Sequence, residues 1–421
     1  MIMSEWKEVR LGDLCYKVCS GGTPKSTCSS YYEGGTIPWL NTKEINYNRI
    51  FETESHITED GLNNSSAKWI DSNAVVVAMY GATAGRVAIA KVPMTTNQAC
   101  CNLMIDSSKA DYNFIYYYLS NSYKYLLSMA NGAAQQNLNA QIIKDLFISL
   151  PSLDEQRSIA SILSSLDSKI ENNRKICANL EAQAQALFKH WFIDFAPFKD
   201  GKFVESELGM IPEGWRVGTY NDIIQETISG DWGKESLDGN YIHKVACIRG
   251  CDFQDVKMGL RGKTPERYIL EKNFQSKRFE DKDVLVEISG GTATVSTGRI
   301  CPISQLLIDK YNGDIICTNF CRLVRPHKGY SSYLYYSWKY KYDKKVMFGY
   351  ENGTSGIKNF SIKDFTMREP LVLPTLTALN EFEGMIEHIH TQIQNCGSES
   401  SKLANIRDTL LPKLMSGEIK V

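Results

Sequence analysis

Apolar residues recur at helical spacing along two stretches of the chain. The series after Pro151 contains Ile159, Ile162, Leu166, Ile170, Leu180 and Leu187, and the series after Pro374 contains Phe382, Met385, Ile389, Ile393, Leu403 and Leu410. Steps of three, four and seven residues place such side chains on one stripe of an α-helix. A helix of about 40 residues is about 60 Å long, so one small domain cannot cover its stripe. The pattern predicts two helices, near 151–192 and 374–415, that pack together as a coiled coil.

The segment before each helix has a different pattern. Val75–Val77 and Val284–Val286 are short β-branched runs followed by glycine, which is typical of strands. The tyrosine-rich runs FIYYYL and YLYYSW predict short helices that cover a sheet, and SGGTPK, NGAAQQN and NGTSG predict exposed loops. Gly397 and Ser398 are poor helix formers, so we expect a kink or break there in the second helix.

These two parts occur twice. Trp6, Asp13 and Ser20-Gly21 match Trp215, Asp222 and Ser229-Gly230 at an offset of 209, the helices match at an offset of 223, and Thr96-Asn97 matches Thr318-Asn319. Collinear matches of this kind indicate a duplication. The sequence predicts an α+β fold with internal pseudo-two-fold symmetry: two mixed α/β domains, each followed by a long helix. The helices are expected to run antiparallel, because each leaves its own domain and the domains should lie at opposite ends.

The predicted boundaries follow from these patterns. They are a first domain at 1–150, a helix at 151–195, a linker at 196–214, a second domain at 215–372, a second helix at 373–416 and a tail at 417–421. The linker is assigned from its proline, glycine and polar content.

Composition adds a class of protein. Hydrophobic residues make up 43% and charged residues 23% of the 421 residues, as in a soluble protein of two or three domains. The charged start has no signal-peptide pattern and no apolar run is long enough for a membrane span, so we expect a cytoplasmic protein. Three pairs among the 12 cysteines share the spacing C-x-x-x-C: Cys15/Cys19, Cys247/Cys251 and Cys317/Cys321. We interpret them as buried thiols on strands and expect no metal.

Charge is unevenly distributed along the chain. The net charge is −1, yet the segment 241–350 contains 19 Lys and Arg against 11 Asp and Glu. A basic segment inside an acidic chain favours a polyanionic partner such as nucleic acid.

No catalytic motif is recognisable. The sequence lacks the P-loop G-x-x-x-x-G-K-[ST], H-E-x-x-H, G-x-S-x-G and N-P-P-[YF], and SGGTATVSTG lacks the spacing G-x-G-x-x-G. His388 and His390 point in different directions on a helix, so we expect them to be solvated rather than ligands. The chain is therefore expected to be no enzyme and to bind no cofactor.

Four segments resemble one known family, the specificity subunits of type I restriction-modification systems. They are LEAQAQALFKHWFIDFAPF (Leu180–Phe198), LLPKLMSGEIKV (Leu410–Val421), PEGWRVGTYNDI (Pro212–Ile223) and WKEVRLGDL from Trp6. The resemblance covers essentially the whole chain, and the first two motifs are the most specific.

The resemblance implies a function. Each domain would recognise one half of a split double-stranded DNA target, and the helices would space the domains and dock methyltransferase subunits. Those partners would methylate adenine with S-adenosylmethionine, and a restriction subunit would add ATP- and Mg-dependent translocation and cleavage. A coiled-coil scaffold joining two protein-binding domains is the alternative, and a stand-alone methyltransferase or nuclease is a third interpretation.

Reading bases requires donors and acceptors on exposed loops, and holding phosphates requires cations. The candidates in the first domain are Thr23, Lys25, Asn41, Thr42, Lys43, Tyr80, Thr83, Arg86, Asn97, Gln98, Gln135 and Gln136. Those in the second domain are Trp232, Lys234, Arg249, Asp252, Ser289, Thr292, Arg299, Asn319, Thr354 and Lys358. The same loops differ in sequence between the domains, which predicts a bipartite and asymmetric target.

Overall fold

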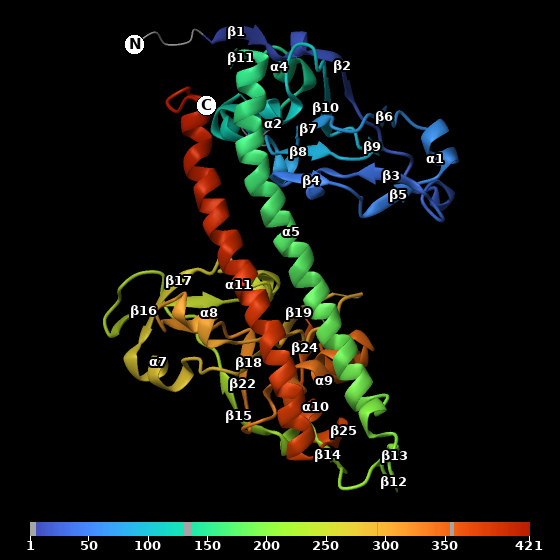
Figure 1. The fold of residues 1–421 in the computed structure, drawn as a ribbon, viewed down its shortest axis with the longest axis vertical. Coiled ribbons are helices and arrows are strands. Elements are labelled where there is room, and N and C mark those ends of the chain that lie inside the picture. Colours follow the sequence, from blue (N-terminus) through green and yellow to red (C-terminus); the bar gives the residue numbers. More distant parts are fainter. Residues whose placement is uncertain (1–5, 130–136, 293, 354–357) are drawn as a thin grey trace. The chain divides into compact units, whose positions relative to one another are not determined.

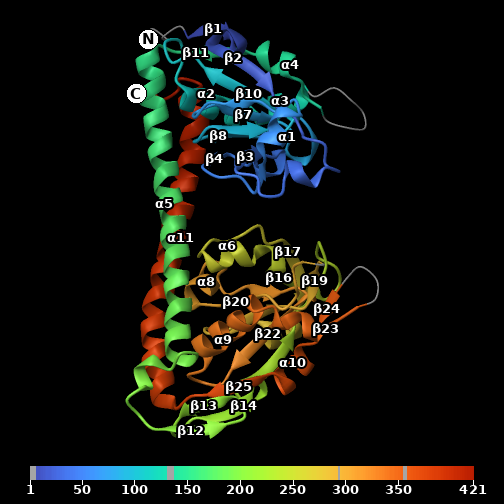
Figure 2. The ribbon, with the colours of Figure 1, turned by 90° about the vertical axis from the view of Figure 1, so that its right-hand side faces the viewer.

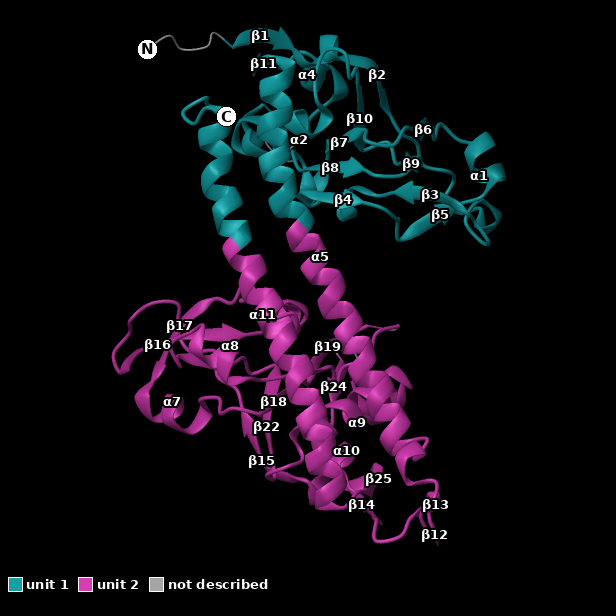
Figure 3. Cartoon of the chain, viewed as in Figure 1, with its two compact units in different colours: residues 1–168, 403–421 teal, residues 169–402 magenta. Residues whose placement is uncertain are grey.

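The computed structural model describes residues 6–129, 137–292, 294–353 and 358–421. The chain forms two compact units, unit 1 with Met1–Ser168 and Leu403–Val421, and unit 2 with Lys169–Lys402. Both long helices cross from one unit to the other (Figure 3). Each unit therefore contains part of both helices, so its core is built from distant parts of the sequence.

Unit 1 is a mixed α/β domain of two main sheets (Figure 1). Its strands are β1 (Lys7–Arg10), β2 (Cys15–Ser20), β3 (Ile37–Leu40), β4 (Asn48–Ile50), β5 (Ser55–Ile57), β6 (Trp69–Ile70), β7 (Val75–Ala78), β8 (Val87–Ala90), β9 (Met94–Thr96), β10 (Cys100–Ile105) and β11 (Phe147–Leu150). They form sheets of order β2-β10-β7-β8-β4 and β5-β3-β9-β6 and a separate β1-β11 pair. Its short helices are α1 (Glu59–Asn63), α2 (Tyr112–Asn121), α3 (Tyr123–Ser128) and α4 (Ala140–Lys144).

The core of unit 1 lies between the larger sheet, α2 and the long helices. Val75 and Val77 of β7 and Phe114 of α2 share one buried apolar cluster with Ile159 and Leu414, which come from the two long helices. The predicted tyrosine-rich helix is confirmed as α2, and the side chain of Asp111 caps its first turn.

Unit 2 has the same layers with more irregular strands (Figure 2). Its strands are β12 (Phe203–Ser206), β13 (Gly209–Pro212), β14 (Arg216–Thr219), β15 (Ile224–Ser229), β16 (Tyr241–Ile248), β17 (Glu266–Leu270), β18 (Val284–Glu287), β19 (Ser289–Gly291), β20 (Ile300–Pro302), β21 (Ile315–Cys317), β22 (Cys321–Pro326), β23 (Glu351–Asn352), β24 (Lys358–Phe360) and β25 (Pro370–Leu373). Its short helices are α6 (Phe253–Lys257), α7 (Glu271–Lys277), α8 (Gln305–Asp309), α9 (Ser331–Asp343) and α10 (Ile362–Arg368). The second tyrosine-rich run is α9, as predicted.

The strand topology repeats between the units. The order β15-β22-β18-β20 corresponds to β2-β10-β7-β8, and β14-β25 corresponds to β1-β11. The parallel pair β16-β21 corresponds to the parallel pair β3-β9. The duplication predicted from the sequence is therefore present in the fold.

One predicted match is out of register by one residue. The amide of Asn97 donates to the carbonyl of Leu40 at 3.0 Å, and its structural counterpart is the amide of Thr318, which donates to Ile248 at 3.0 Å. The matched pairs are therefore Asn97 with Thr318, and Gln98 with Asn319. The match in sequence pairs two identical Thr-Asn dipeptides. In the fold, the equivalent residues are those that occupy the same place in the turn after the parallel strand.

The two long helices are α5 (Leu153–Phe192) and α11 (Leu376–Met415), each of 40 residues. Within unit 2, Asn173 bonds Ser400 and Cys177 contacts Ile393, so numbers rise on one helix as they fall on the other. The predicted antiparallel pair is confirmed.

The buried stripe differs from the predicted one. Leu166, Leu180 and Leu187 are only half-buried, at its edge. The buried positions of α5 include Ile159, Leu163, Ile170, Asn173, Cys177, Ala184 and Phe188. These side chains include small and polar ones, which an apolar pattern cannot detect.

The second helix has no break at Gly397. It is helical throughout 376–415, so the expectation of a break at Gly397 and Ser398 is wrong. A Cβ at Gly397 would overlap the carbonyl of Met258 and the backbone of Gly259. The glycine serves the packing of the loop after α6 against the helix, and tertiary contact outweighs its low helix propensity.

The predicted linker contains regular structure. Within 196–214 the antiparallel hairpin β12-β13 forms, with Phe203 opposite Pro212. In the part of the chain that the structure describes, no helix is both long and apolar enough to cross a membrane.

Candidate nucleic-acid interface

The loop after β2 lies against the end of β9 in unit 1. A Cβ at Gly21 would overlap the carbonyl of Thr96, so only glycine permits this approach. The amide of Gly22 donates to the same carbonyl at 2.9 Å. The hydroxyl of Thr23 then donates to the Oε1 of Gln98, and both side chains are exposed. The structure thus brings together two candidates that are far apart in sequence.

Unit 2 builds the same crossing with other side chains. A Cβ at Gly230 would overlap the carbonyl of Thr318, and the amide of Asp231 donates to Cys317 at 2.9 Å. The ammonium of Lys277 braces the loop by donating to the carbonyls of Ser229 and Gly230 at 3.0 and 2.8 Å. The side chains exposed around this crossing are Trp232, Asn319 and Phe320.

The turns after β3 and β16 are held by capping boxes. In unit 1 the amide of Asn41 donates to Glu44, and in unit 2 the amide of Arg249 donates to Asp252, each at 3.0 Å. Asn97 donates through its amide to Asn41 Oδ1 at 3.3 Å. Thr42 and Lys43 lie in the first of these turns.

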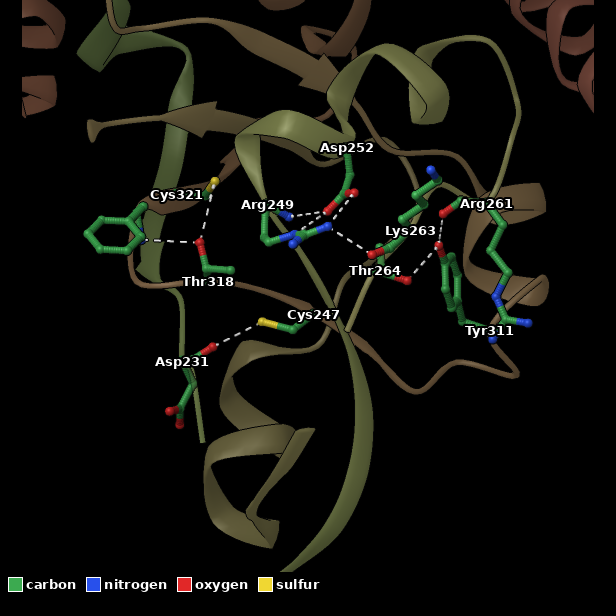
Figure 4. Close-up of polar contacts among 11 residues, drawn as sticks. Asp231, Cys247, Arg249, Asp252, Arg261, Lys263, Thr264, Tyr311, Thr318 and Cys321 are labelled. Carbon is green, nitrogen blue, oxygen red and sulfur yellow. Dashed lines mark hydrogen bonds and ion pairs between the residues drawn. The ribbon is translucent and has the colours of Figure 1, made fainter. Parts of the chain in front are cut away.

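Arg249 and Asp252 form hydrogen bonds within the protein. The Arg249 guanidinium bonds both oxygens of Asp252 at 3.0 and 3.1 Å and the carbonyl of Lys263 at 2.8 Å (Figure 4). Asp252 is 3% exposed, so it is not available to a base. These two candidates fix a turn rather than project from it.

Several candidate cations are paired with carboxylates. The ion pairs are Lys43–Glu54 at 2.6 Å, Lys234–Asp238 at 3.4 Å, Arg299–Glu287 at 2.6 Å and Lys358–Glu351 at 3.0 Å. The two hydrogen bonds to Glu287 raise the pKa of Arg299. Of these pairs, Arg299–Glu287 lies within the basic segment 241–350.

The remaining candidates are scattered. Lys25 and Tyr80 are exposed, Thr83 is half-buried, and Arg86 donates to Asn46 at 3.0 Å. Ser289 lies on β19 and Thr292 is exposed in the turn that follows. Gln135, Gln136 and Thr354 lie outside the described residues.

Sequence reasoning missed Phe320, which is 64% exposed beside Asn319. An aromatic residue inside an otherwise polar loop was the available signal. Arg261 and Lys263 are exposed cations of the same unit that were also missed. The guanidinium of Arg261 lies over the ring of Tyr311, 4.7 Å from its centre. Figure 4 shows this guanidinium at the edge of the residues drawn there.

His390 was expected to be solvated, but it is half-buried. Its ring bonds the hydroxyl of Tyr336 at 2.9 Å, which also bonds Glu181 at 3.2 Å. Burial lowers the pKa of His390. The equivalent positions in unit 1 are Tyr117 and Asp167, whose side chains bond at 2.5 Å, with Arg407 at 2.7 Å from Asp167. Each unit thus has a polar cluster where its tyrosine-rich helix meets the long helices.

The cysteines of the C-x-x-x-C pairs follow the strands. Cys15 and Cys19 lie on β2, and Cys247, Cys317 and Cys321 are buried at strand ends, whereas Cys251 is exposed. Burial raises the pKa of Cys15, Cys247 and Cys321 to about 12. Among the described residues, no group of three or more His, Cys, Asp or Glu side chains could hold a metal ion.

Comparison with known proteins finds relatives along the whole chain. Residues 3–182 match the family described as type I restriction modification DNA specificity domain. The MjaIX specificity subunit of a type I restriction enzyme from Methanocaldococcus jannaschii is 28% identical, over 100% of this chain and 95% of the relative. The HindI specificity subunit from Haemophilus influenzae is 21% identical, over 99% and 100%. The solved S subunit of a type I restriction-modification system from M. genitalium has a TM-score of 0.55 at 18% identity, covers 97% of this chain and 96% of its own, and shares the fold.

Proposed function

We propose that the chain is a specificity subunit of a type I restriction-modification system, as the relatives that match it are, and that its two domains read two unlike halves of a split DNA target. One observation carries this proposal: both units build the same glycine crossing, and each presents different side chains from it. A common frame with different donors selects different bases.

The first frame offers hydrogen bonds. The Thr23 hydroxyl donates to Gln98 Oε1, so the amide nitrogen of Gln98 keeps its donors for a base edge. Amide side chains pair well with adenine in the major groove. The first half-site is therefore expected to depend on a polar contact through Gln98.

The second frame offers aromatic surface. Trp232 carries the guanidinium of Arg267 over its ring at 3.9 Å, and Phe320 projects beside Asn319. Apolar side chains contact the thymine methyl group or enter a deformable base step. The second half-site is therefore expected to depend on shape and apolar contact as well as on Asn319.

The chemistry of the complex belongs to partner subunits in this proposal. The chain binds methyltransferase subunits and a restriction subunit, in the cytoplasm. S-adenosylmethionine, ATP and Mg²⁺ bind to those partners, and no residue of this chain has a catalytic role. The relatives along the whole chain favour this function over a scaffold that joins two protein-binding domains.

Mapping methylated adenines across a host genome that expresses the complex tests the proposal. We expect a motif of two unlike half-sites separated by a fixed spacer. Replacing residues 1–150 with the first domain of another family member changes one half-site and keeps the other. A matched replacement of 215–372 changes the opposite half. A single uninterrupted motif, or a perfect palindrome, contradicts the proposal.

A further inference from the structure

Two cysteines lie on contacting turns of the helix pair within unit 2. Cys177 lies on α5 and Cys396 on α11, and both are free cysteines. The sulfur of Cys177 is 3.7 Å from the carbonyl oxygen of Ile393, one turn before Cys396. Cys396 is close enough to raise the pKa of the Cys177 thiol, after burial as the larger cause.

Neighbouring contacts hold these turns together. Asn173, one turn before Cys177, donates to the carbonyl of Cys396 at 3.4 Å and to the hydroxyl of Ser400 at 3.2 Å. At the offset of 223 that relates the helices, Cys177 corresponds to Ser400 and Cys396 to Asn173. The positions equivalent to Cys396 and Cys177 are thus Asn173 and Ser400, whose side chains form a hydrogen bond of 3.2 Å.

Small side chains permit this close approach. Gly397 follows Cys396, and Ala184 is fully buried one heptad after Cys177. A sulfur that reaches a backbone carbonyl of the facing helix requires the two backbones to lie close. A disulfide bond needs the same closeness, with Cα atoms about 4.4–6.8 Å apart.

We propose that Cys177 and Cys396 form an intramolecular disulfide bond when the chain meets a low-molecular-weight disulfide. The half-buried Cys396 is the entry point, since Cys177 is buried. Its thiolate attacks one sulfur of the reagent and releases one thiolate. Cys177 then loses its proton and attacks the sulfur of Cys396, which releases the second thiolate. Two protein thiols are oxidised, and one reagent disulfide is reduced to two thiols.

The bond joins α5 to α11 and closes a loop that contains residues 178–395. Most of unit 2 lies inside this loop. Closing a long loop restricts the unfolded chain, so the oxidised protein resists unfolding more than the reduced protein does. This inference does not depend on the DNA-recognition function.

The test uses the full chain treated with oxidised glutathione at pH 8.5, followed by digestion without reduction and mass spectrometry. We expect a peptide pair linked through Cys177 and Cys396 and faster migration in a non-reducing denaturing gel. Dithiothreitol reverses both changes. The oxidised chain also unfolds at a higher denaturant concentration than the reduced chain.

Two variants provide matched controls. Cys177→Ser introduces the residue that the second helix has at the equivalent position, Ser400, so the helix pair is expected to accept it. This variant accumulates glutathione on Cys396 without forming the link. Cys396→Ser leaves Cys177 unmodified because the entry thiol is gone.

The pH dependence of the second step adds a further criterion. Burial, with the nearby Cys396 as the next cause, raises the pKa of Cys177 to about 11. The thiolate fraction of Cys177, and with it the rate of ring closure, therefore increases about tenfold per pH unit between pH 7 and 9. The proposal is overturned if Cys396 takes up glutathione without linking to Cys177. It is also overturned if Cys396 pairs with another cysteine, or if the link forms only after denaturation.

Discussion

At the loop edge of each unit, one polar side chain holds the turn and the next one projects outward. Asn97 accepts a hydrogen bond from the amide of Ala99 at 3.1 Å, and Thr318 accepts one from the amide of Phe320 at 3.3 Å. A buried amide without a partner costs about 1–3 kcal/mol. Asn97 and Thr318 therefore hold their turns, whereas the next residues, Gln98 and Asn319, are exposed.

The same distinction between a side chain that holds a turn and one that is exposed predicts different effects on stability for two candidates in unit 2. Asp252→Ala removes the capping box and leaves the Arg249 guanidinium without its carboxylate, so we expect a loss of about 1–3 kcal/mol in unfolding free energy. Asn319→Ala changes an exposed residue and is expected to leave the melting temperature within about 1 °C.

Denaturant unfolding and duplex binding by the assembled complex separate these effects. Asn319→Ala is expected to weaken binding to the second half-site without altering stability. A stable Asp252→Ala variant with weakened binding would place Asp252 among the DNA-contacting residues instead.

His390 gives unit 2 a specific pH dependence. Burial lowers its pKa in the folded state below the ordinary value of 6.5, although the nearby Glu181 and Glu383 oppose this. Below pH 6.5 the unfolded imidazole therefore binds a proton that the folded one does not. Stability is fully present above this value and decreases as pH falls toward the folded pKa, by up to about 1.4 kcal/mol per pH unit.

Denaturant unfolding at pH 7.5 and 5.5 measures this effect. We expect wild type to lose stability between these values and His390→Gln to lose less. His388→Gln, at an exposed position two residues earlier, should behave as wild type. An equal pH response in His390→Gln and wild type would show that His390 is not the group responsible.

At the scale of elements, periodicity found the helices but not their contacts. It identified α5 and α11 because their lengths exceed what a single domain can cover. It misplaced the seam because Asn173, Cys177 and Ala184 are buried without being strongly apolar. Likewise, Asp252 and Arg249 were predicted as exposed loop residues, since the sequence does not show that the Arg249 guanidinium donates to the Asp252 carboxylate. Pairings between distant residues, such as Thr23 with Gln98, require the folded chain.

Gly397 and Gly384 lie on the same helix, and replacing each with alanine is expected to change stability in opposite directions. A Cβ at Gly397 would overlap the backbone around Met258, so Gly397→Ala is expected to destabilise unit 2 by about 1–3 kcal/mol. A Cβ at Gly384 would point into open space, so Gly384→Ala raises helix propensity and stabilises by up to about 1 kcal/mol. Thermal unfolding of both variants measures the difference. A stabilised Gly397→Ala would show that the loop after α6 does not pack on the helix.

At the scale of the whole molecule, each unit depends on residues from both helices. Leu414 is fully buried in the core of unit 1, although it lies more than 290 residues after Phe114 in the same cluster. We expect Leu414→Ala to cost about 2–5 kcal/mol in unit 1. Ile406→Ala, on the same helix but 48% exposed, should cost less than about 1 kcal/mol.

Hydrogen–deuterium exchange resolves this effect by region. In Leu414→Ala, peptides of β7 and α2 are expected to exchange faster, while those of β16 and β22 in unit 2 keep their wild-type rates. Faster exchange in unit 2 alone would contradict the assignment of Leu414 to the core of unit 1.

The division of unit 1 into two sequence segments has a consequence for synthesis on the ribosome. Ile159 and Leu163 are translated before unit 2, but the side chains that cover them, including Leu414 and Met415, follow it. At roughly 5–20 residues per second, the ribosome needs roughly 10–50 s to translate the intervening residues. During that interval the nascent first unit exposes an apolar strip on its helix, a surface that chaperones bind. The first unit to be synthesised is thus the last to complete its core.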